Sequence, residues 1–385
     1  MSEMFPLGSV VNVSSGQPAL KANEFAEDGK PFIRAGSLEN LLNGGSLLDC
    51  EKISDDTAEK KRLRLYPKDT IVFAKSGMSA TLGRVYRLSE PAYVVSHLAA
   101  LVPTGRYDPV FLTYWLRENP PSRLIKDPAY PSIRVGEIRN LNVPDVSLKE
   151  QRRIAMILDK ADGVRRKREQ ALEMANELLQ AAFLEMFGDP VGNRRGFRVG
   201  TIRDLLEEVR YGTAKKASES EGEFPVLRMG NITYSGSLDV GDLKYVDLNE
   251  SEKQKYILNN GDILFNRTNS SDLVGKTAVF DLDGDFTYAG YLVRGRVNDK
   301  VADPYFISGY LNSRHGKSVL RAMCKSIIGM ANINAQEFQN IKIMMPPLSL
   351  QKKYRQIVEG VSGHKILLSR QLTESGQMFS TLSAR

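Results

Sequence analysis

Residues 147–190 read SLKEQRRIAMILDKADGVRRKREQALEMANELLQAAFLEMFGDP, and this stretch predicts one long helix. Between Ile154 and Met186, most positions at alternating steps of four and three are apolar or small, which is typical of a coiled-coil seam. Gly188 suits a helix C-cap and Pro190 cannot continue the hydrogen-bond ladder, so the helix should end there. At about 1.5 Å per residue, such a helix is about 60 Å long, which suits a spacer.

One glycine inside this stretch requires an explanation. A glycine in a helix interior costs about 1 kcal/mol relative to alanine. We therefore expect either a bend in the helix at Gly163 or another segment that packs closely against it.

The C-terminal residues 350–382 repeat the same spacing of apolar residues, from Tyr354 through Ser375 and Phe379 to Leu382. The two stretches also match residue for residue at an offset of 200, as in Leu148 and Leu348, Gln151 and Gln351, Ile157 and Ile357, Gly163 and Gly363, and Leu172 and Leu372. Two helices with the same pattern are expected to pack on each other within the chain. The alternative is that they are core helices of two separate domains.

The duplication continues upstream of both helices. Matching segments are 31–38 with 225–232, 69–77 with 261–269, 108–111 with 303–306, and 132–143 with 332–343. Short β-type runs alternate with polar loops in each copy, and Asp108-Pro109 and Asp303-Pro304 are typical helix starts. The sequence therefore predicts two copies of one α+β domain, each followed by a long helix.

Composition narrows the class of protein. The 385 residues carry a formal net charge of +7, a mild excess that permits nucleic-acid binding without arguing for it. Cys50 and Cys324 are too few and too far apart for a disulfide framework or a cysteine zinc site. Without a long apolar run or a signal peptide, we expect a soluble, cytoplasmic chain with no membrane partner.

Motifs for catalysis are weak. Residues 119–122 (NPPS) and 127–130 (DPAY) are imperfect forms of the motif by which amino-methyltransferases hold a flipped base, and simple turns are the better interpretation. Gly275-Lys276-Thr277 lacks the leading glycine of a phosphate-binding loop, because Ser270 stands there. We therefore predict no catalytic residue, no metal ligand and no cofactor site in this chain.

Three duplicated positions keep a positive charge in both copies. They are Arg34 with Arg228, Lys75 with Arg267, and Arg84 with Lys276. If the domains bind DNA, these six side chains are candidates to contact phosphates or guanine edges. The alternative is that they form structural ion pairs or are solvated strand residues.

The junctions between domains and helices carry a resemblance to a known family. Pro144 followed by LKEQRRIAMIL, the segment FLEMFGDPVGN, and MPPLSLQKKYRQIV with Pro346, Leu348 and Gln351 together resemble the specificity subunit of type I restriction-modification systems. The first junction departs slightly, since Asp145-Val146-Ser147 replaces the usual second proline. The resemblance covers nearly the whole chain.

The resemblance implies an α+β fold with two mixed α/β target recognition domains, two long antiparallel coiled-coil helices and a pseudo-two-fold internal repeat. The implied boundaries are 1–146 for the first recognition domain, 147–190 for the central helix, 191–347 for the second recognition domain and 348–385 for the C-terminal helix. Such a subunit is non-catalytic.

The resemblance further implies that the subunit reads an asymmetric two-part target in double-stranded DNA, with one domain for each half-site. Its helices act as a spacer and receive two modification (methyltransferase) subunits, and restriction (translocase and nuclease) subunits complete the complex. S-adenosylmethionine, ATP and Mg²⁺ are implied for these partners and not for this chain. The competing hypothesis is a coiled-coil scaffold with two ligand- or protein-binding heads.

Overall fold

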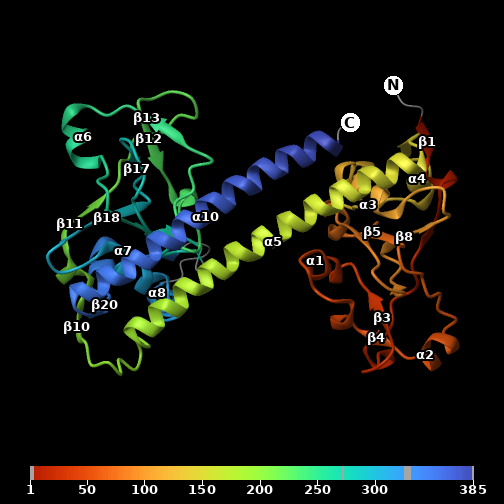
Figure 1. Cartoon of the computed structure of the whole chain (residues 1–385), viewed down its shortest axis with the longest axis horizontal. Coiled ribbons are helices and arrows are strands. Elements are labelled where there is room, and N and C mark those ends of the chain that lie inside the picture. The colour runs from red at the N-terminus through yellow and green to blue at the C-terminus, as the bar shows by residue number, and fades with distance from the viewer. Residues whose placement is uncertain (1–3, 271–272, 325–330, 384–385) are drawn as a thin grey trace. The chain divides into compact units, whose positions relative to one another are not determined.

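The computed structural model describes residues 4–270, 273–324 and 331–383, and divides the chain into two compact units. Unit 1 comprises Met1–Lys167 and Leu372–Arg385, and unit 2 comprises Arg168–Gln371. The strands of the four-stranded and three-stranded sheets follow one another in the same order in both units (Figure 1). The expected duplicated α+β fold is therefore confirmed.

Unit 1 contains two sheets and a short strand pair. The four-stranded sheet has the order β2-β8-β5-β6, the three-stranded sheet has the order β4-β3-β7, and β1 pairs with β9. The strands are β1 (Met4–Pro6), β2 (Val11–Ser15), β3 (Lys30–Ile33), β4 (Lys52–Ile53), β5 (Ile71–Ala74), β6 (Val85–Arg87), β7 (Tyr93–Val94), β8 (Leu98–Pro103) and β9 (Asn142–Pro144). The helices are α1 (Ser37–Leu42), α2 (Asp55–Lys60), α3 (Pro109–Glu118) and α4 (Val135–Arg139), with 3-10 turns η1 (Leu7–Ser9), η2 (Ala22–Glu24), η3 (Leu47–Asp49), η4 (Met78–Leu82) and η5 (Pro121–Leu124).

Unit 2 repeats this topology. Its sheets have the orders β11-β18-β14-β16 and β13-β12-β17, with the pairs β10-β20 and β15-β19. The strands are β10 (Arg198–Thr201), β11 (Leu206–Tyr211), β12 (Phe224–Leu227), β13 (Lys244–Val246), β14 (Ile263–Asn266), β15 (Thr268–Asn269), β16 (Thr277–Val279), β17 (Thr287–Tyr288), β18 (Leu292–Val297), β19 (Ala331–Asn332) and β20 (Lys342–Met345). The helices are α6 (Glu250–Tyr256), α7 (Pro304–Asn312), α8 (Arg314–Met323) and α9 (Ala335–Gln339), with 3-10 turns η6 (Ile202–Leu205) and η7 (Met229–Asn231).

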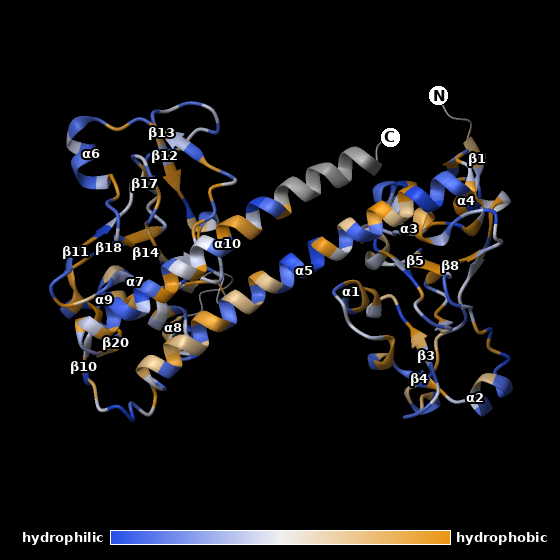
Figure 2. Ribbon diagram, viewed as in Figure 1, coloured by the Kyte–Doolittle hydropathy of each residue, from blue (hydrophilic) through white to orange (hydrophobic). Residues whose placement is uncertain are grey.

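The central strands form because nearly every residue in them is apolar and buried. All four residues of β5 and all four of β14 are buried, as expected for strands with neighbours on both sides. Figure 2 shows β3, β12 and β14 as hydrophobic segments inside their units. The predicted starts of α3 and α7 are also confirmed, since the Asp108 carboxylate accepts from the backbone N–H of Val110 and Phe111, and Asp303 accepts from Tyr305.

The central helix α5 runs from Leu148 to Phe187, and its 40 residues confirm the predicted long helix. Gly188 follows with φ of 77°, the left-handed conformation that suits a glycine C-cap. The helix is continuous through Gly163, and, apart from the neighbouring residues and backbone of α5 itself, no described atom lies within 4 Å of the place where a Cβ would stand. Close packing is therefore not the reason for this glycine.

The C-terminal helix α10 (Leu348–Ser383) packs against α5 within unit 2. The Arg168 guanidinium donates to the Gln371 carbonyl at 2.9 Å, while the rings of Phe183 and Phe187 each lie 5.5 Å from the Tyr354 ring. Residue numbers thus run in opposite directions along the two helices, which confirms an antiparallel pair. The seam positions Ser375, Phe379 and Leu382 lie outside the residues whose side chains the structure describes.

A buried glutamine fixes each globular domain to its long helix. The Gln151 amide oxygen accepts from the Asp108 backbone N–H at 2.8 Å, and the Gln151 amide nitrogen donates to the Val146 carbonyl at 2.7 Å. Gln351 repeats this arrangement, since it accepts from the Asp303 N–H at 2.9 Å. Each glutamine side chain therefore joins the start of α3 or α7 to the start of α5 or α10.

Candidate nucleic-acid interface

Lys75 and Arg267 occupy equivalent places in the two units. Each directly follows the central strand of the four-stranded sheet, β5 or β14. The Lys75 N–H donates to the carbonyl of His97 at 2.9 Å, and the Arg267 N–H donates to the carbonyl of Tyr291 at 3.1 Å. Their own carbonyls accept from Ile133 at 2.7 Å and from Ile333 at 2.9 Å. The backbone geometry therefore confirms that these two positions are duplicates.

The side chains of Lys75 and Arg267 are half-buried and lack a carboxylate partner within the described part of the chain. The Arg267 guanidinium lies 5.0 Å from the centre of the Tyr211 ring, a cation–π contact. Its Nη1 also makes a long hydrogen bond of 3.5 Å to the Gly290 carbonyl. Both charges thus remain available to an anionic ligand.

Arg34 and Arg228 form ion pairs inside their own units. Arg34 directly follows β3, and its Nε lies 2.7 Å from Glu51 Oε2. Arg228 directly follows β12, and its Nη2 lies 2.8 Å from Asp242 Oδ2. In this structure both guanidinium groups therefore act as structural ion-pair partners. All four side chains are at least partly exposed, so a phosphate could still compete for the arginines.

Arg84 and Lys276 connect the start of a strand to the helical turn that follows β3 or β12. Arg84 Nη2 lies 2.9 Å from Glu39 Oε1 on α1. Lys276 Nζ donates to the Met229 carbonyl at 3.0 Å and also to the Ile232 carbonyl at the end of η7. Burial lowers the pKa of the Lys276 ammonium. The duplicated charge at this position therefore has a structural use in both units.

The three positions lie together at one end of each sheet. Phe73 pairs with Val85, so Lys75 and Arg84 lie at the same end of the β5–β6 hairpin. Phe265 pairs with Thr277 in the same way, which places Arg267 and Lys276 at the same end of β14–β16. The turn after β3 or β12, which carries Arg34 or Arg228, is tied to this end through Arg84 or Lys276. Whether these residues contact DNA remains a prediction.

Three basic residues on α8 were absent from the sequence prediction. They are Arg314, Lys317 and Arg321, in a helix that replaces the short turn η5 of unit 1. A search for duplicated charges cannot find them, because unit 1 has no counterpart. Their spacing of three and four residues could have indicated that they share one face of a helix.

A protein family described as "Type I restriction modification DNA specificity domain" matches residues 2–174 and 195–375. The chain belongs to this family. Both matched ranges contain one complete globular domain and most of the helix that follows it.

Individual relatives agree with this assignment. The specificity subunit of the type I restriction enzyme EcoKI from Escherichia coli K12 is 22% identical over 375 residues, which cover 92% of this chain and 80% of that protein. The StySPI specificity subunit of Salmonella potsdam is also 22% identical, with the same coverage of both chains. A protein of Methanocaldococcus jannaschii that bears the name of the MjaX specificity subunit is 30% identical over 164 residues, only 42% of this chain and 38% of that protein.

A solved structure shares the fold. The crystal structure of the type I restriction-modification S subunit from M. genitalium matches 100% of this chain and 95% of that chain, with a TM-score of 0.63 and 16% identity. Specificity subunits are the non-catalytic DNA-recognition components of type I systems.

The two methyltransferase-like segments of this specificity subunit are turns. Pro121–Leu124 forms the 3-10 turn η5, and the Asp127 carboxylate accepts from the Ala129 N–H at 2.9 Å. The interpretation of both segments as turns is therefore confirmed. Among the described residues, no helix combines the length and apolar character that a membrane crossing requires.

Proposed function

We propose that this specificity subunit reads an asymmetric, two-part sequence in double-stranded DNA, with one globular domain on each half-site. The observation that carries the proposal is a duplicated domain whose two copies have unlike side chains at equivalent places. Lys75 and Arg267 share one backbone position, yet a guanidinium presents a rigid planar fork of donors to a base edge, whereas an ammonium is a compact charge on a flexible stem. Two such unlike domains require two unlike half-sites.

The long helices fit the role of a spacer between the half-sites. Proteins that bind one face of B-DNA read half-sites about 34–36 Å apart, or a multiple of that distance. A helix of 40 residues is about 60 Å long, so α5 has the required reach. In this proposal the length of α5 sets the number of base pairs between the half-sites.

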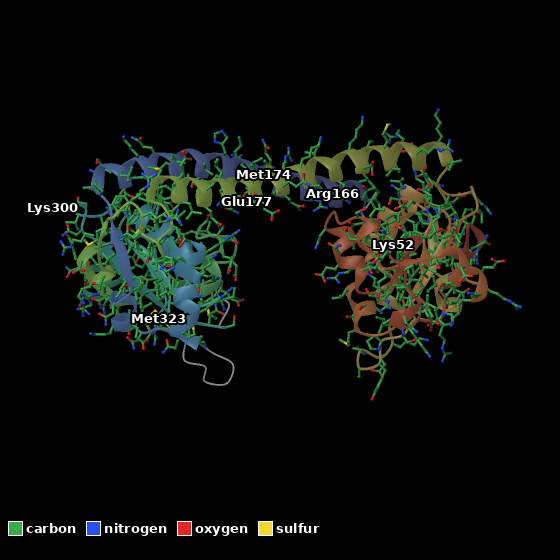
Figure 3. All side chains as sticks on the ribbon, turned by 90° about the horizontal axis from the view of Figure 1, so that it is seen from below. Lys52, Arg166, Met174, Glu177, Lys300 and Met323 are labelled. Carbon is green, nitrogen blue, oxygen red and sulfur yellow. The ribbon has the colours of Figure 1, made fainter. Side chains whose placement is uncertain are left out.

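The helices also suit the docking of partner subunits. Ile157 and Ile357 stand at equivalent places on α5 and α10, and each side chain is 37% exposed. Further exposed apolar side chains on these helices are Met156, Val164, Met174, Leu178, Leu184, Ile366 and Leu367, of which Met174 is visible in Figure 3. Among these positions Ile157 and Ile357 are duplicated, and equivalent exposed apolar positions on both helices support two modification subunits for each specificity subunit.

The chemistry belongs to the partners in this proposal. The modification subunits bind S-adenosylmethionine and methylate adenine, and the restriction subunits use ATP and Mg²⁺. This chain itself binds DNA and needs no cofactor. The proposal therefore assigns it target choice and assembly.

The test is a map of methyladenine across the source genome, with and without the gene for this chain. We expect deletion to remove methylation from one asymmetric two-part motif and to leave other motifs unchanged. The motif would give both half-sites and their spacing. If the chain is co-expressed with its modification subunits and the complex shows no salt-dependent DNA binding, it is a protein-binding scaffold and the proposal is wrong.

A further inference from the structure

Helix α8 (Arg314–Met323) has no equivalent helix in unit 1. At the equivalent place unit 1 has only η5 (Pro121–Leu124). Both elements cover the same glycine turn, since a Cβ on Gly275 would lie 2.7 Å from Leu320, and a Cβ on Gly83 would lie 3.1 Å from Ser122 Oγ. Unit 2 therefore has a helix on a surface that unit 1 covers with a turn.

One side of α8 packs against unit 2. Leu320 is 2% exposed, and a Cβ on Gly316 would lie 2.3 Å from the Tyr310 carbonyl, so only glycine allows α8 to approach α7 this closely. Met323, the last residue of α8, lies on the side of unit 2 away from the α5–α10 pair (Figure 3). The helix is thus held firmly, and its end faces away from the helix pair.

Another face of α8 is basic. Arg314, Lys317 and Arg321 are spaced by three and four residues, so they lie on one side of the helix. The ten residues of α8 include no aspartate or glutamate. Within the described part of the chain, none of these three side chains forms an ion pair, whereas Arg228, Arg294 and several other basic residues of unit 2 do.

Lys317 and Arg321 line a small cavity together with Lys276. Its remaining described lining residues are Tyr234, Val274 and Gly275. Lys317 Nζ lies 3.3 Å from the centre of the Tyr234 ring and donates to the Tyr234 carbonyl at 2.9 Å. The described lining residues therefore bring three cationic groups together and include no carboxylate.

Burial in this cavity perturbs the pKa values of both lysines. Burial, together with the neighbouring Arg321 guanidinium, lowers the pKa of the Lys317 ammonium to about 8. Burial also lowers the pKa of Lys276. An anion at this place would compensate the charges and would favour the protonated form of Lys317.

We propose that Lys317 and Arg321, on the basic face of α8, bind a phosphodiester of the DNA backbone at the half-site read by unit 2. The proposal rests on the function proposed above and adds a contact that unit 1 lacks. Phosphate contacts fix the position of a protein on DNA and carry no sequence information. Unit 2 thus holds its half-site with an additional anchor that does not depend on the bases.

The test uses the complex of this chain with its modification subunits, and a fluorescent DNA duplex that contains the mapped target. The variants are Lys317→Gln, Arg321→Gln and the double variant. Lys300→Gln is the matched control, because Lys300 is an exposed lysine in a turn of unit 2 and lies apart from Met323 at the end of α8 (Figure 3). We expect each α8 variant to weaken binding roughly tenfold at about 0.1 M salt, since a charge-assisted phosphate contact is lost.

The dependence of DNA affinity on salt and on DNA sequence distinguishes a phosphate contact from a base contact. Each lost phosphate contact should reduce the slope of log K against log salt by about 0.9, and affinity for unrelated duplex should fall by the same factor as affinity for the target. Arg321→Lys should restore most of the affinity because it keeps the charge. Thermal unfolding of each variant verifies that unit 2 remains folded.

Three results have distinct meanings. If the unmodified complex fails to bind its target, the proposed function itself is wrong. If the unmodified complex binds and the α8 variants bind equally well with the same salt slope, the α8 site is wrong. If the loss is confined to the target sequence, these side chains read a base, and the assignment to a phosphodiester is overturned.

Discussion

Replacement of Gln351 by leucine tests whether one buried amide holds the second globular domain on α10. Gln351 is 1% exposed, accepts from the Asp303 N–H at 2.9 Å, and donates to the Pro346 carbonyl at 2.8 Å. A third, longer hydrogen bond of 3.4 Å runs to the Val301 carbonyl. Leucine fills a similar volume but can make none of these bonds.

The expected loss of unfolding free energy in Gln351→Leu follows from the polar groups that would be left without hydrogen-bond partners. Leucine would leave the Asp303 N–H and the Pro346 carbonyl without these hydrogen-bond partners, and each buried unpaired group costs about 1–3 kcal/mol. Because leucine recovers part of this loss through its own burial, we expect unit 2 to lose about 2–4 kcal/mol of unfolding free energy.

Urea unfolding combined with hydrogen-exchange mass spectrometry measures this loss and locates it. Peptides from α7 (Pro304–Asn312) should exchange faster in Gln351→Leu, because Asp303 is the N-cap of that helix. Gln356→Leu is the matched control, since Gln356 is an exposed glutamine on the same helix. Gln151→Leu should produce the same effect on α3 in unit 1.

The reasoning is refuted if Gln351→Leu and Gln356→Leu unfold within about 0.5 kcal/mol of each other, the range of ordinary surface substitutions. It is also refuted if the faster exchange appears away from α7. Either result would mean that apolar contacts alone hold the domain on its helix.

Three further predictions concern DNA contacts and the charges inside unit 2. Lys75→Ala and Arg267→Ala should each weaken DNA binding by the assembled complex and reduce methylation of the target. If affinity, target choice and methylation are unchanged in both variants, these two residues are not DNA contacts. Arg294→Met should destabilise unit 2 by about 1–3 kcal/mol in urea unfolding, because the buried Arg294 guanidinium loses its hydrogen bond to Glu208 while Glu208 keeps its ion pair with Arg210. A cost below about 0.5 kcal/mol would contradict this. Burial alone would raise the pKa of the Glu208 carboxyl, but the hydrogen bond from Arg210 and the charge of Arg294 lower it overall. The stability from this lowered pKa is therefore present above the unfolded pKa of about 4.3 and is lost as pH falls through the folded pKa. The unfolding free energy of Glu208→Gln should therefore fall less steeply between pH 6 and pH 3 than that of the unmodified chain. Parallel pH profiles of the two proteins would refute this.

The candidate interface shows where prediction from sequence stops. The duplicated charges were visible from the repeat, and the equivalent backbone bonds of Lys75 and Arg267 bear out that they are duplicates. Their surroundings were not visible. Arg84 meets Glu39, and Lys276 meets the carbonyl of Met229, across 45 and 47 positions of sequence. Side-chain pairs so far apart depend on how the two sheets pack, and no local pattern records that.

Helix α8 was also beyond the reach of the argument from repeats. It has no counterpart in unit 1, so comparison of the two copies could not reveal the basic face of Lys317 and Arg321. The same limit applies to Arg294, whose equivalent in unit 1 is Ala100 within an apolar sheet. The sequence alone does not distinguish a buried arginine from an exposed one, because burial and carboxylate partners are set by the folded chain.

The sequence by itself determined the two long helices, the α+β class, the duplication and the family. These follow from periodicity, from helix caps such as Asp108 and Gly188, and from matches between the two copies at offsets of 192 to 200, all of which are read along the chain without knowledge of how it folds. Only the tertiary structure decided which charges are compensated, why Gln151 and Gln351 are glutamines, and where a cationic surface remains open. Those outcomes depend on which distant groups meet in the folded chain, because an electrostatic or hydrogen-bond partner acts only within a few ångströms.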